Sequence, residues 1–289
     1  MKKILVPTDL SPIAERGLSL AVEIAERSEA EISLDNFTRH PFGKTFTAMG
    51  EVRSKVDQEG ELFNLQLLHI NKQKLDALAE KYSQRGVDIQ TAIVDEDFKD
   101  GIDEYLHRES IDLIVMGTSG EENATEAFTG NHTEQVIKIS TCPVLSVRDG
   151  YQVKDFSKIV LAVNVMKDKS HVNNALNTLA DLAACFDSHI YLVHVRDRAT
   201  DYSNLDLNMY FTKMAEDAAL RNYTVNIFEA DDQANGVIAF AREIKAGLIA
   251  VIKNSSDGIF RIFSNHFSDR LVKEVGRPVF TFNLQNVED

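Results

Sequence analysis

Short apolar runs rich in β-branched residues alternate with segments of helical periodicity along the first half of the chain. Such runs are typical of strands buried on both faces of a parallel sheet, whereas apolar residues three to four positions apart indicate amphipathic helices. The strands are expected at Ile4–Val6, Ile32–Leu34, Ile89–Val94, Leu113–Met116 and Val144–Val147. The alternation predicts an α/β fold, in which helices cover both faces of a doubly wound parallel sheet.

Four helices are expected between these strands. Over residues 12–26 the apolar side chains share one stripe, behind Ser11 as the N-cap and Pro12 as the first helical residue. The others are expected over 61–83 (where leucines share a stripe), from Asp100 and Gly101 onward, and from Thr133 to Ser140.

The same elements recur in the second half. The segments DGIDEY, DLIVM and CPVLSV return as NGVIAF, GLIAV and RPVFTF at a common offset of 135 residues. Near the start, KKILVPTDLS returns as SKIVLAVNVM. Because repeats of this length are whole domains, the chain is expected to hold two tandem domains, 1–148 and 155–289, joined by a short polar linker. Between Phe37 and Ala79 the first copy carries 22 more residues than the second.

Composition and charge narrow the functional classes. The 289 residues carry a formal net charge of −14, which disfavours both nucleic acid and anionic membrane surfaces as partners. No apolar run approaches the roughly 20 residues that cross a bilayer, and the start of the chain does not look like a signal peptide. A cytoplasmic protein is therefore expected.

The spacing of the cysteines and histidines matches neither a set of metal ligands nor a catalytic nucleophile with its base. Cys142 and Cys185 both lie in apolar surroundings and are expected to be small buried hydrophobic residues. His194, on a predicted strand, is expected to be a hydrogen-bonded core residue. No nucleophile stands near a base at a readable spacing, so an enzyme is not favoured; weak ATPase activity or autophosphorylation is the most that is expected.

Two suggestive stretches fall at one end of the predicted sheet. In a doubly wound sheet, ligands bind beyond the carboxyl ends of the strands, where the first and fourth strands lie together. The first strand ends at Asp9, and the fourth is followed by Gly117, Gly120 and Gly130, the last directly before a helix. Amide groups at a helix start can hold phosphate, but these glycines could equally be turn residues and Asn131 a simple N-cap.

These motifs resemble the universal stress protein family. The segments ILVPTDLS, LIVMGTSG and GNHTEQVIKISTCPVLSV carry the resemblance, and both copies align with the family across almost their whole length. Its nucleotide-binding members have glycine, two residues, glycine, nine residues, then glycine and serine or threonine, and the three glycines here fit that spacing. The resemblance implies two Rossmann-like domains with strand order 3-2-1-4-5, paired through their last strands so that one chain imitates a dimer.

The resemblance also implies an adenine-nucleotide site in the first copy, for ATP or else AMP or ADP, with Mg²⁺ as a possible companion of the phosphates. The residues that would form it are Pro7, Thr8, Asp9, Phe37, Met116, Gly117, Ser119, Gly120, Gly130, Asn131, His132 and Thr133. Two of them depart from the family pattern. Asn131 replaces a serine or threonine, and Phe37 replaces a small aliphatic residue near the adenine.

The second copy lacks these features. The counterparts of the three glycines are Ile252, Ser255 and Asn265, and Asn164 and His266 replace Asp9 and Asn131. Because added side chains crowd the backbone there, the second copy is not expected to bind nucleotide through this loop. The favoured function is therefore a nucleotide-binding stress or signalling protein with an unknown protein partner. The alternative is a tandem adaptor that binds no nucleotide, and a further homodimer is compatible with either.

Overall fold

A computed structural model provides the fold of this protein. It describes residues 1–38, 58–118, 130–148, 156–165, 172–196, 202–230, 232–253 and 277–284. The predicted linker and the residues Ser119, Gly120, Ser255, Asn265 and His266 lie outside these ranges.

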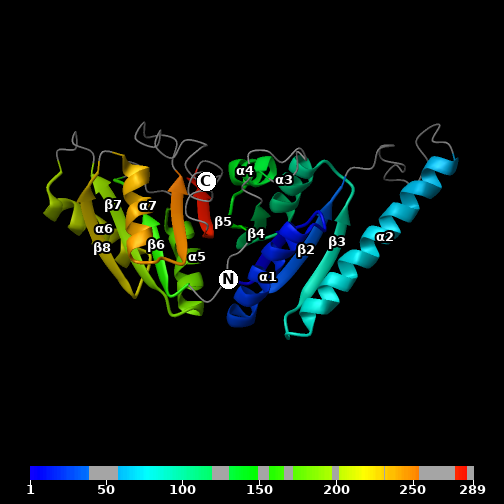
Figure 1. Cartoon of the computed structure of the whole chain (residues 1–289), viewed down its shortest axis with the longest axis horizontal. Helices are drawn as coiled ribbons and strands as arrows, with labels where there is room; N and C mark the ends of the chain where they lie inside the picture. Colours follow the sequence, from blue (N-terminus) through cyan, green and yellow to red (C-terminus); the bar gives the residue numbers. More distant parts are fainter. Residues whose placement is uncertain are drawn as a thin grey trace.

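One continuous sheet runs through the described chain, in the order β3-β2-β1-β4-β5-β10-β9-β6-β7-β8 (Figure 1). The first half contributes β1 (Lys3–Pro7), β2 (Glu31–Phe37), β3 (Ile89–Val94), β4 (Leu113–Thr118) and β5 (Val144–Arg148). The second half contributes β6 (Lys158–Ala162), β7 (His189–Arg196), β8 (Tyr223–Glu229), β9 (Leu248–Lys253) and β10 (Val279–Asn283). Within each half all pairings are parallel, and both halves follow the order 3-2-1-4-5, which confirms the predicted fold class.

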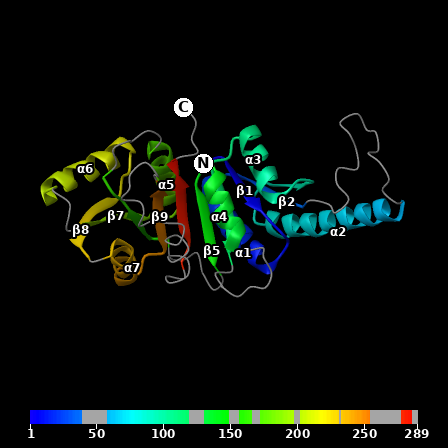
Figure 2. The ribbon, with the colours of Figure 1, turned by 90° about the horizontal axis from the view of Figure 1, so that it is seen from above.

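The two halves meet at their last strands. β10 pairs antiparallel with β5, with Phe280 opposite Leu145 in the register, so the predicted contact between CPVLSV and RPVFTF is confirmed. The junction is extended by the amino group of Met1, which lies 2.8 Å from a carboxylate oxygen of Asp181. Figure 2 shows the two halves side by side, with β5 and β10 at the centre.

Helices cover both faces of the first half. The helices are α1 (Pro12–Ser28), α2 (Gln58–Ser83), α3 (Phe98–Arg108), α4 (Gly130–Ile139), α5 (Val172–Cys185), α6 (Asn204–Asp217) and α7 (Gln233–Glu243). The core between the sheet and α1 and α2 is continuous with that of the second half, whereas α3 and α4 close a separate core on the other face. Ser11 caps α1 as predicted, since its Oγ accepts a hydrogen bond from the Ala14 amide at 3.1 Å.

Several boundaries differ from the sequence predictions. α3 begins at Phe98 behind the N-cap Asp97, so Asp100 and Gly101 lie inside the helix rather than opening it. α4 begins at Gly130, three residues earlier than predicted. β3 is only half-buried because it is a terminal strand of the sheet, with a neighbour on one side.

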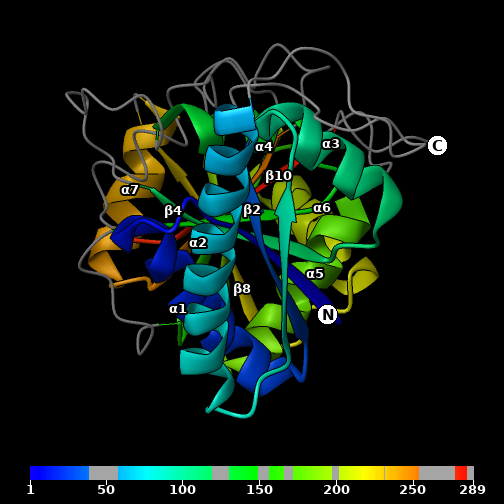
Figure 3. The same ribbon diagram turned by 90° about the vertical axis from the view of Figure 1, so that its right-hand side faces the viewer.

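The leucine stripe of α2 packs in part. Leu75 is fully buried, whereas Leu65 is 58% exposed. The N-terminal part of α2 extends beyond the sheet, as Figures 2 and 3 show, so a helical period in the sequence did not guarantee a buried face.

The two cysteines differ in burial. Cys142 is buried as predicted, and burial raises the pKa of its thiol to about 12. Cys185 is only half-buried, so its prediction as a buried residue was wrong.

In the described part of the chain, no helix combines the length and apolarity that crossing a membrane requires.

His194 is a core residue, as predicted, but one of its nitrogens has no hydrogen-bond partner among the described residues. Its ring is 2% exposed, and Nδ1 donates to the Val163 carbonyl at 3.0 Å. Nε2 makes no hydrogen bond to any described residue. In the first half, Asn36 makes the same contact, since its Nδ2 donates to the Thr8 carbonyl at 2.7 Å. The repeat therefore uses one side chain in each half to tie the second strand to the end of the first.

The substitution His194→Asn is expected to make stability less dependent on pH. Burial lowers the pKa of His194 in the folded chain, so the unfolded chain takes up a proton first as the pH falls below about 6.5. The contribution of His194 to the free energy of unfolding therefore decreases as the pH falls, by at most about 1.4 kcal/mol per pH unit. Urea unfolding at pH 7 and pH 5 measures this loss in both proteins, and equal losses would show that His194 is not its source.

Candidate functional site

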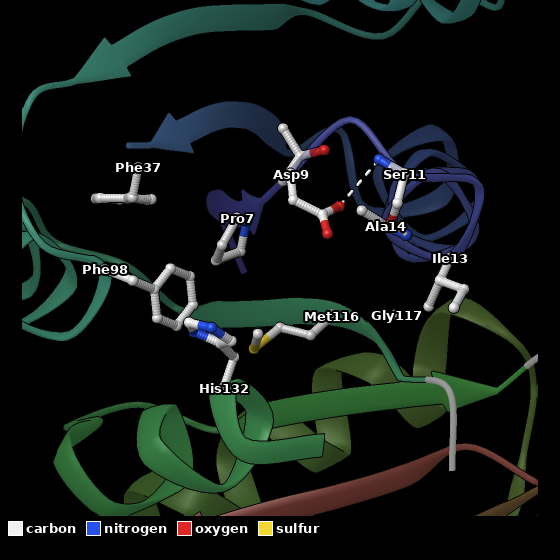
Figure 4. Close-up of a pocket in the computed structure, with 11 residues that line it drawn as sticks. Pro7, Asp9, Ser11, Ile13, Ala14, Phe37, Phe98, Met116, Gly117 and His132 are labelled. Atoms are coloured by element: carbon white, nitrogen blue, oxygen red, sulfur yellow. Dashed lines mark hydrogen bonds between the residues drawn. The ribbon is translucent and has the colours of Figure 1, made fainter. Parts of the chain in front are cut away.

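A pocket lies at the carboxyl ends of β1 and β4, where the sheet order predicted a site. Its walls come from the turn after β1, the start of α1, the ends of β2 and β4, and the starts of α3 and α4 (Figure 4). The lining residues are Pro7, Thr8, Asp9, Ser11, Ile13, Ala14, Phe37, Phe98, Met116, Gly117 and His132.

The pocket is a narrow slot. Its cavity volume is only about 40 Å³. A planar base would therefore need some of the lining side chains to move apart.

The polar end of the slot is a tight turn that follows β1. Leu10 lies in the left-handed region with φ of 64°, and its amide donates to Thr8 Oγ1 at 3.0 Å. The Ser11 amide donates to Asp9 Oδ1 at 2.9 Å, the contact dashed in Figure 4. The Asp9 side chain is exposed, so its second carboxylate oxygen faces an open environment. This carboxylate can accept a hydrogen bond from a ligand hydroxyl or amino group.

An aromatic wall closes the opposite end. Phe37 is 7% exposed and meets Phe98 edge-on, with ring centroids 6.1 Å apart. Phe98 in turn meets His132 edge-on at 4.1 Å. Gly101 makes room for this wall, since a Cβ there would lie 2.9 Å from Phe37 Cδ1. The family resemblance placed Phe37 near the adenine. Phe98 was not predicted to line the site, because the third helix was expected to begin two residues later, at Asp100.

Gly117 lies within β4, not in a turn after it, and this corrects the sequence interpretation. A Cβ on Gly117 would lie 1.8 Å from the Ile13 carbonyl oxygen, and one on Gly17 would lie 2.7 Å from the Gly117 amide nitrogen. The pair lets the first turns of α1 pack directly against the strand. Packing therefore explains this glycine without any ligand.

The start of α4 faces the slot. Gly130 and Asn131 begin the helix, although the Asn131 side chain lies outside the described atoms. The Thr133 hydroxyl is buried, and no described residue hydrogen-bonds to it. Burial lowers the pKa of His132, while the carboxylates of Asp9 and Asp97 act in the opposite direction. A helix start with a buried hydroxyl that lacks a partner suits an anionic group.

The structure brings together most of the predicted site residues. Pro7, Thr8, Asp9, Phe37, Met116, Gly117 and His132 line one pocket, while Gly130, Asn131 and Thr133 lie at the helix start beside it. Of the remaining lining residues, Ser11, Ile13 and Ala14 belong to the cap and first turn of α1. Their position behind a strand-end turn was the signal that could have identified them.

The corresponding corner of the second half differs. Ile252 lies in β9 and is 2% exposed, at the position of Gly117. Asn164 replaces Asp9, is 7% exposed, and accepts a hydrogen bond from the Val165 amide at 2.9 Å. An apolar side chain and an occupied amide oxygen thus replace the glycine and the exposed carboxylate. Across the described residues of both halves, no three or more histidine, cysteine or acidic side chains form a metal-binding group.

Comparison with known proteins gives a consistent family. The model of the universal stress protein family matches residues 1–148. Universal stress protein YxiE of Bacillus subtilis is 29% identical over 156 residues, covering 50% of this chain and 98% of its own. Universal stress protein MJ0577 of Methanocaldococcus jannaschii is 30% identical over 154 residues, covering 51% of this chain and 94% of its own.

Solved structures extend the likeness of fold to the whole chain. A universal stress protein from Archaeoglobus fulgidus superposes with a TM-score of 0.70 at 15% identity, covering 97% of this chain and 98% of that one. The cytoplasmic domain of a prokaryotic cation chloride cotransporter superposes with a TM-score of 0.58 at 12% identity, covering 99% and 98%. At these identities the likeness concerns the fold alone.

Proposed function

Because the chain belongs to the universal stress protein family, we propose that it is a cytoplasmic stress-response or signalling protein whose first half binds ATP or another adenine nucleotide. The observation that carries the proposal is the slot at the ends of β1 and β4. It places an exposed carboxylate, an apolar wall and a helix start around one cavity in the first half.

Each wall has a place in this proposal. Pro7, Phe37 and Met116 would contact the base, and the exposed carboxylate of Asp9 would accept a hydrogen bond from a ribose hydroxyl. The α4 amides and the Thr133 hydroxyl would hold phosphate. The residues fit such a ligand if the Phe98 and His132 rings, now in contact, separate to widen the slot.

The narrow slot also favours a second candidate, a tandem adaptor of the same fold that binds no nucleotide. In this case the contact between Phe98 and His132 is permanent packing.

Native mass spectrometry of the full chain, as purified and after addition of ATP, separates the two candidates. One adenylate per chain supports the nucleotide-binding protein. A chain that stays bare even in excess ATP supports the adaptor. A chain that carries two adenylates would contradict the asymmetry between the halves.

Nucleotide binding is expected to tighten as the pH falls below neutral. Burial lowers the pKa of His132 in the empty site and so favours its neutral form, whereas a phosphate at the start of α4 would favour its protonated form. Affinity should then rise by at most about tenfold per pH unit, until His132 is protonated in the free protein as well. Calorimetric titration with ATP at several pH values checks this, with His132→Asn as the control for protonation of the phosphates. Equal pH profiles of the two proteins would contradict it.

A further inference from the structure

The outer edge of β3 pairs with no other strand in the described part of the chain. β3 ends the sheet. The amide of Ile32 on β2 donates to the Asp88 carbonyl at 2.9 Å, and the amide of Thr38, directly after β2, donates to the Val94 carbonyl at 3.0 Å. Along a strand of a parallel pair, the backbone N–H and C=O groups of one residue bond to the neighbouring strand, and those of the next residue point away from it. The backbone N–H and C=O groups of Thr91 and Ile93 therefore point outward from the sheet.

The sequence of β3 itself lacks the protection that is usual for a terminal strand. Terminal strands normally carry charged residues or proline, which discourage the pairing of another chain. β3 reads IQTAIV and has neither. On the face away from α2, a groove of about 380 Å³ separates the strand from α3. Its walls include Ala92, Val94, Gly101 and Tyr105.

The equivalent position in the second half is filled. Val94 lies opposite Phe37 in the β2–β3 register, as Phe228 lies opposite Val195 in the β7–β8 register. Phe228 stacks on Phe240 of α7 with centroids 5.8 Å apart and an interplanar angle of 17°. The smaller Val94 leaves this space open in the first half.

The residue that corresponds to Phe240 is Tyr105, and it is held against the sheet. Its hydroxyl lies 2.7 Å from Ser33 Oγ, which donates to the buried carboxylate of Asp35 at 3.1 Å. This polar network keeps the tyrosine ring at the base of the groove. An open groove is therefore a feature of the first half that its repeat does not share.

The rim of the groove is acidic. Asp95 and Glu96 follow β3, and Glu104 projects from α3. The one basic residue among the lining residues, Arg108, has its Nε 3.7 Å from a carboxylate oxygen of Glu109, and its guanidinium lies over the Tyr105 ring. The surplus of negative charge is complementary to a cationic ligand.

We propose that the groove between β3 and α3 docks an extended, lysine- or arginine-bearing segment of a partner protein, which adds to the free edge of β3 as a further strand. Backbone hydrogen bonds to Thr91 and Ile93 hold the segment. Apolar side chains on alternate positions enter the groove over Val94 and Tyr105, and basic side chains meet its acidic rim. The proposal is independent of nucleotide binding.

Fluorescence anisotropy with labelled nonapeptides tests it on the full chain. The probe alternates lysine and valine, and its control carries glutamate in place of lysine. Val94→Phe installs the residue of the second half and fills the groove without a change in charge. Thr91→Pro removes an outward N–H and no bond within the sheet, and Thr91→Ala controls for the lost hydroxyl. Thermal melting confirms that each variant is folded.

Saturable binding of the lysine peptide is expected, at least about tenfold tighter than that of the glutamate peptide. Val94→Phe and Thr91→Pro should weaken it by a similar factor, and Thr91→Ala should not. Equal binding by folded Val94→Phe would show simple attraction to an acidic protein and would overturn the proposal. So would the absence of binding. A wild-type dimer that Val94→Phe converts to a monomer in sedimentation would assign the groove to a second copy and also overturn it.

Discussion

Replacement of Gly117 by alanine is expected to lower the free energy of unfolding by about 3 kcal/mol or more. The added Cβ would lie 1.8 Å from the Ile13 carbonyl oxygen, so backbone rather than a flexible side chain would have to move. Either α1 would shift off β4 or the strand would bend. Both responses disturb packing at the centre of the first half, and urea unfolding followed by circular dichroism measures the loss.

Gly86→Ala is the matched control for this experiment. Gly86 has φ of +85° and nothing within 4 Å of a built Cβ, so its replacement costs only backbone strain, roughly 1 to 2 kcal/mol. If Gly117→Ala unfolds at the same urea concentration as Gly86→Ala, the tight approach of α1 is wrong. The expected instability also means that substitution of Gly117 is a poor test of nucleotide binding, because a loss of binding would follow from a damaged fold.

Asp9→Ala is the better test, and it is expected to weaken ATP binding by roughly tenfold to a hundredfold. A hydrogen bond to a charged group contributes about 1.5 to 3 kcal/mol, and the exposed Asp9 carboxylate is the proposed partner of the ribose. Because the side chain is exposed, folding should change little. Among the described residues, the hydrogen bond from the Ser11 amide is the one side-chain bond of Asp9 that is lost.

Isothermal titration calorimetry with ATP measures the effect. Glu80→Ala, an exposed substitution on α2 that also removes one negative charge, is the control. If both variants bind ATP as the wild type does, the ribose contact is wrong. If both bind more tightly, the overall negative charge and not the site governs affinity.

The architecture could be predicted from the sequence because several signals agreed. Short β-branched runs correctly indicated the buried strands, and the predicted cap at Ser11 was confirmed. The family resemblance implied the pairing of the last strands of the two halves, which was also confirmed. The solvent exposure of individual elements was predicted less well. The half-buried β3 read like its buried neighbours, and the exposed Leu65 lay in a stripe that looked like core.

The position of the pocket was predictable from the sequence, but its detailed lining was less so. The spacing of the glycines pointed to the corner of the sheet where the pocket lies, yet the role of Gly117 depends on an approach of α1 that the sequence pattern does not contain. The contact of Phe98 with His132 joins two helices whose starts were both placed too late. Which rings narrow the slot could therefore be seen only once α3 and α4 were in place.

A crystal structure of the full chain grown with excess ATP tests the proposed function most directly. We predict one nucleotide per chain, with its base in the slot between Pro7, Phe37 and Met116, its phosphates at the start of α4, and the Phe98 and His132 rings moved apart. A slot without nucleotide in which those rings remain in contact, or a nucleotide bound only by the second half, would contradict it.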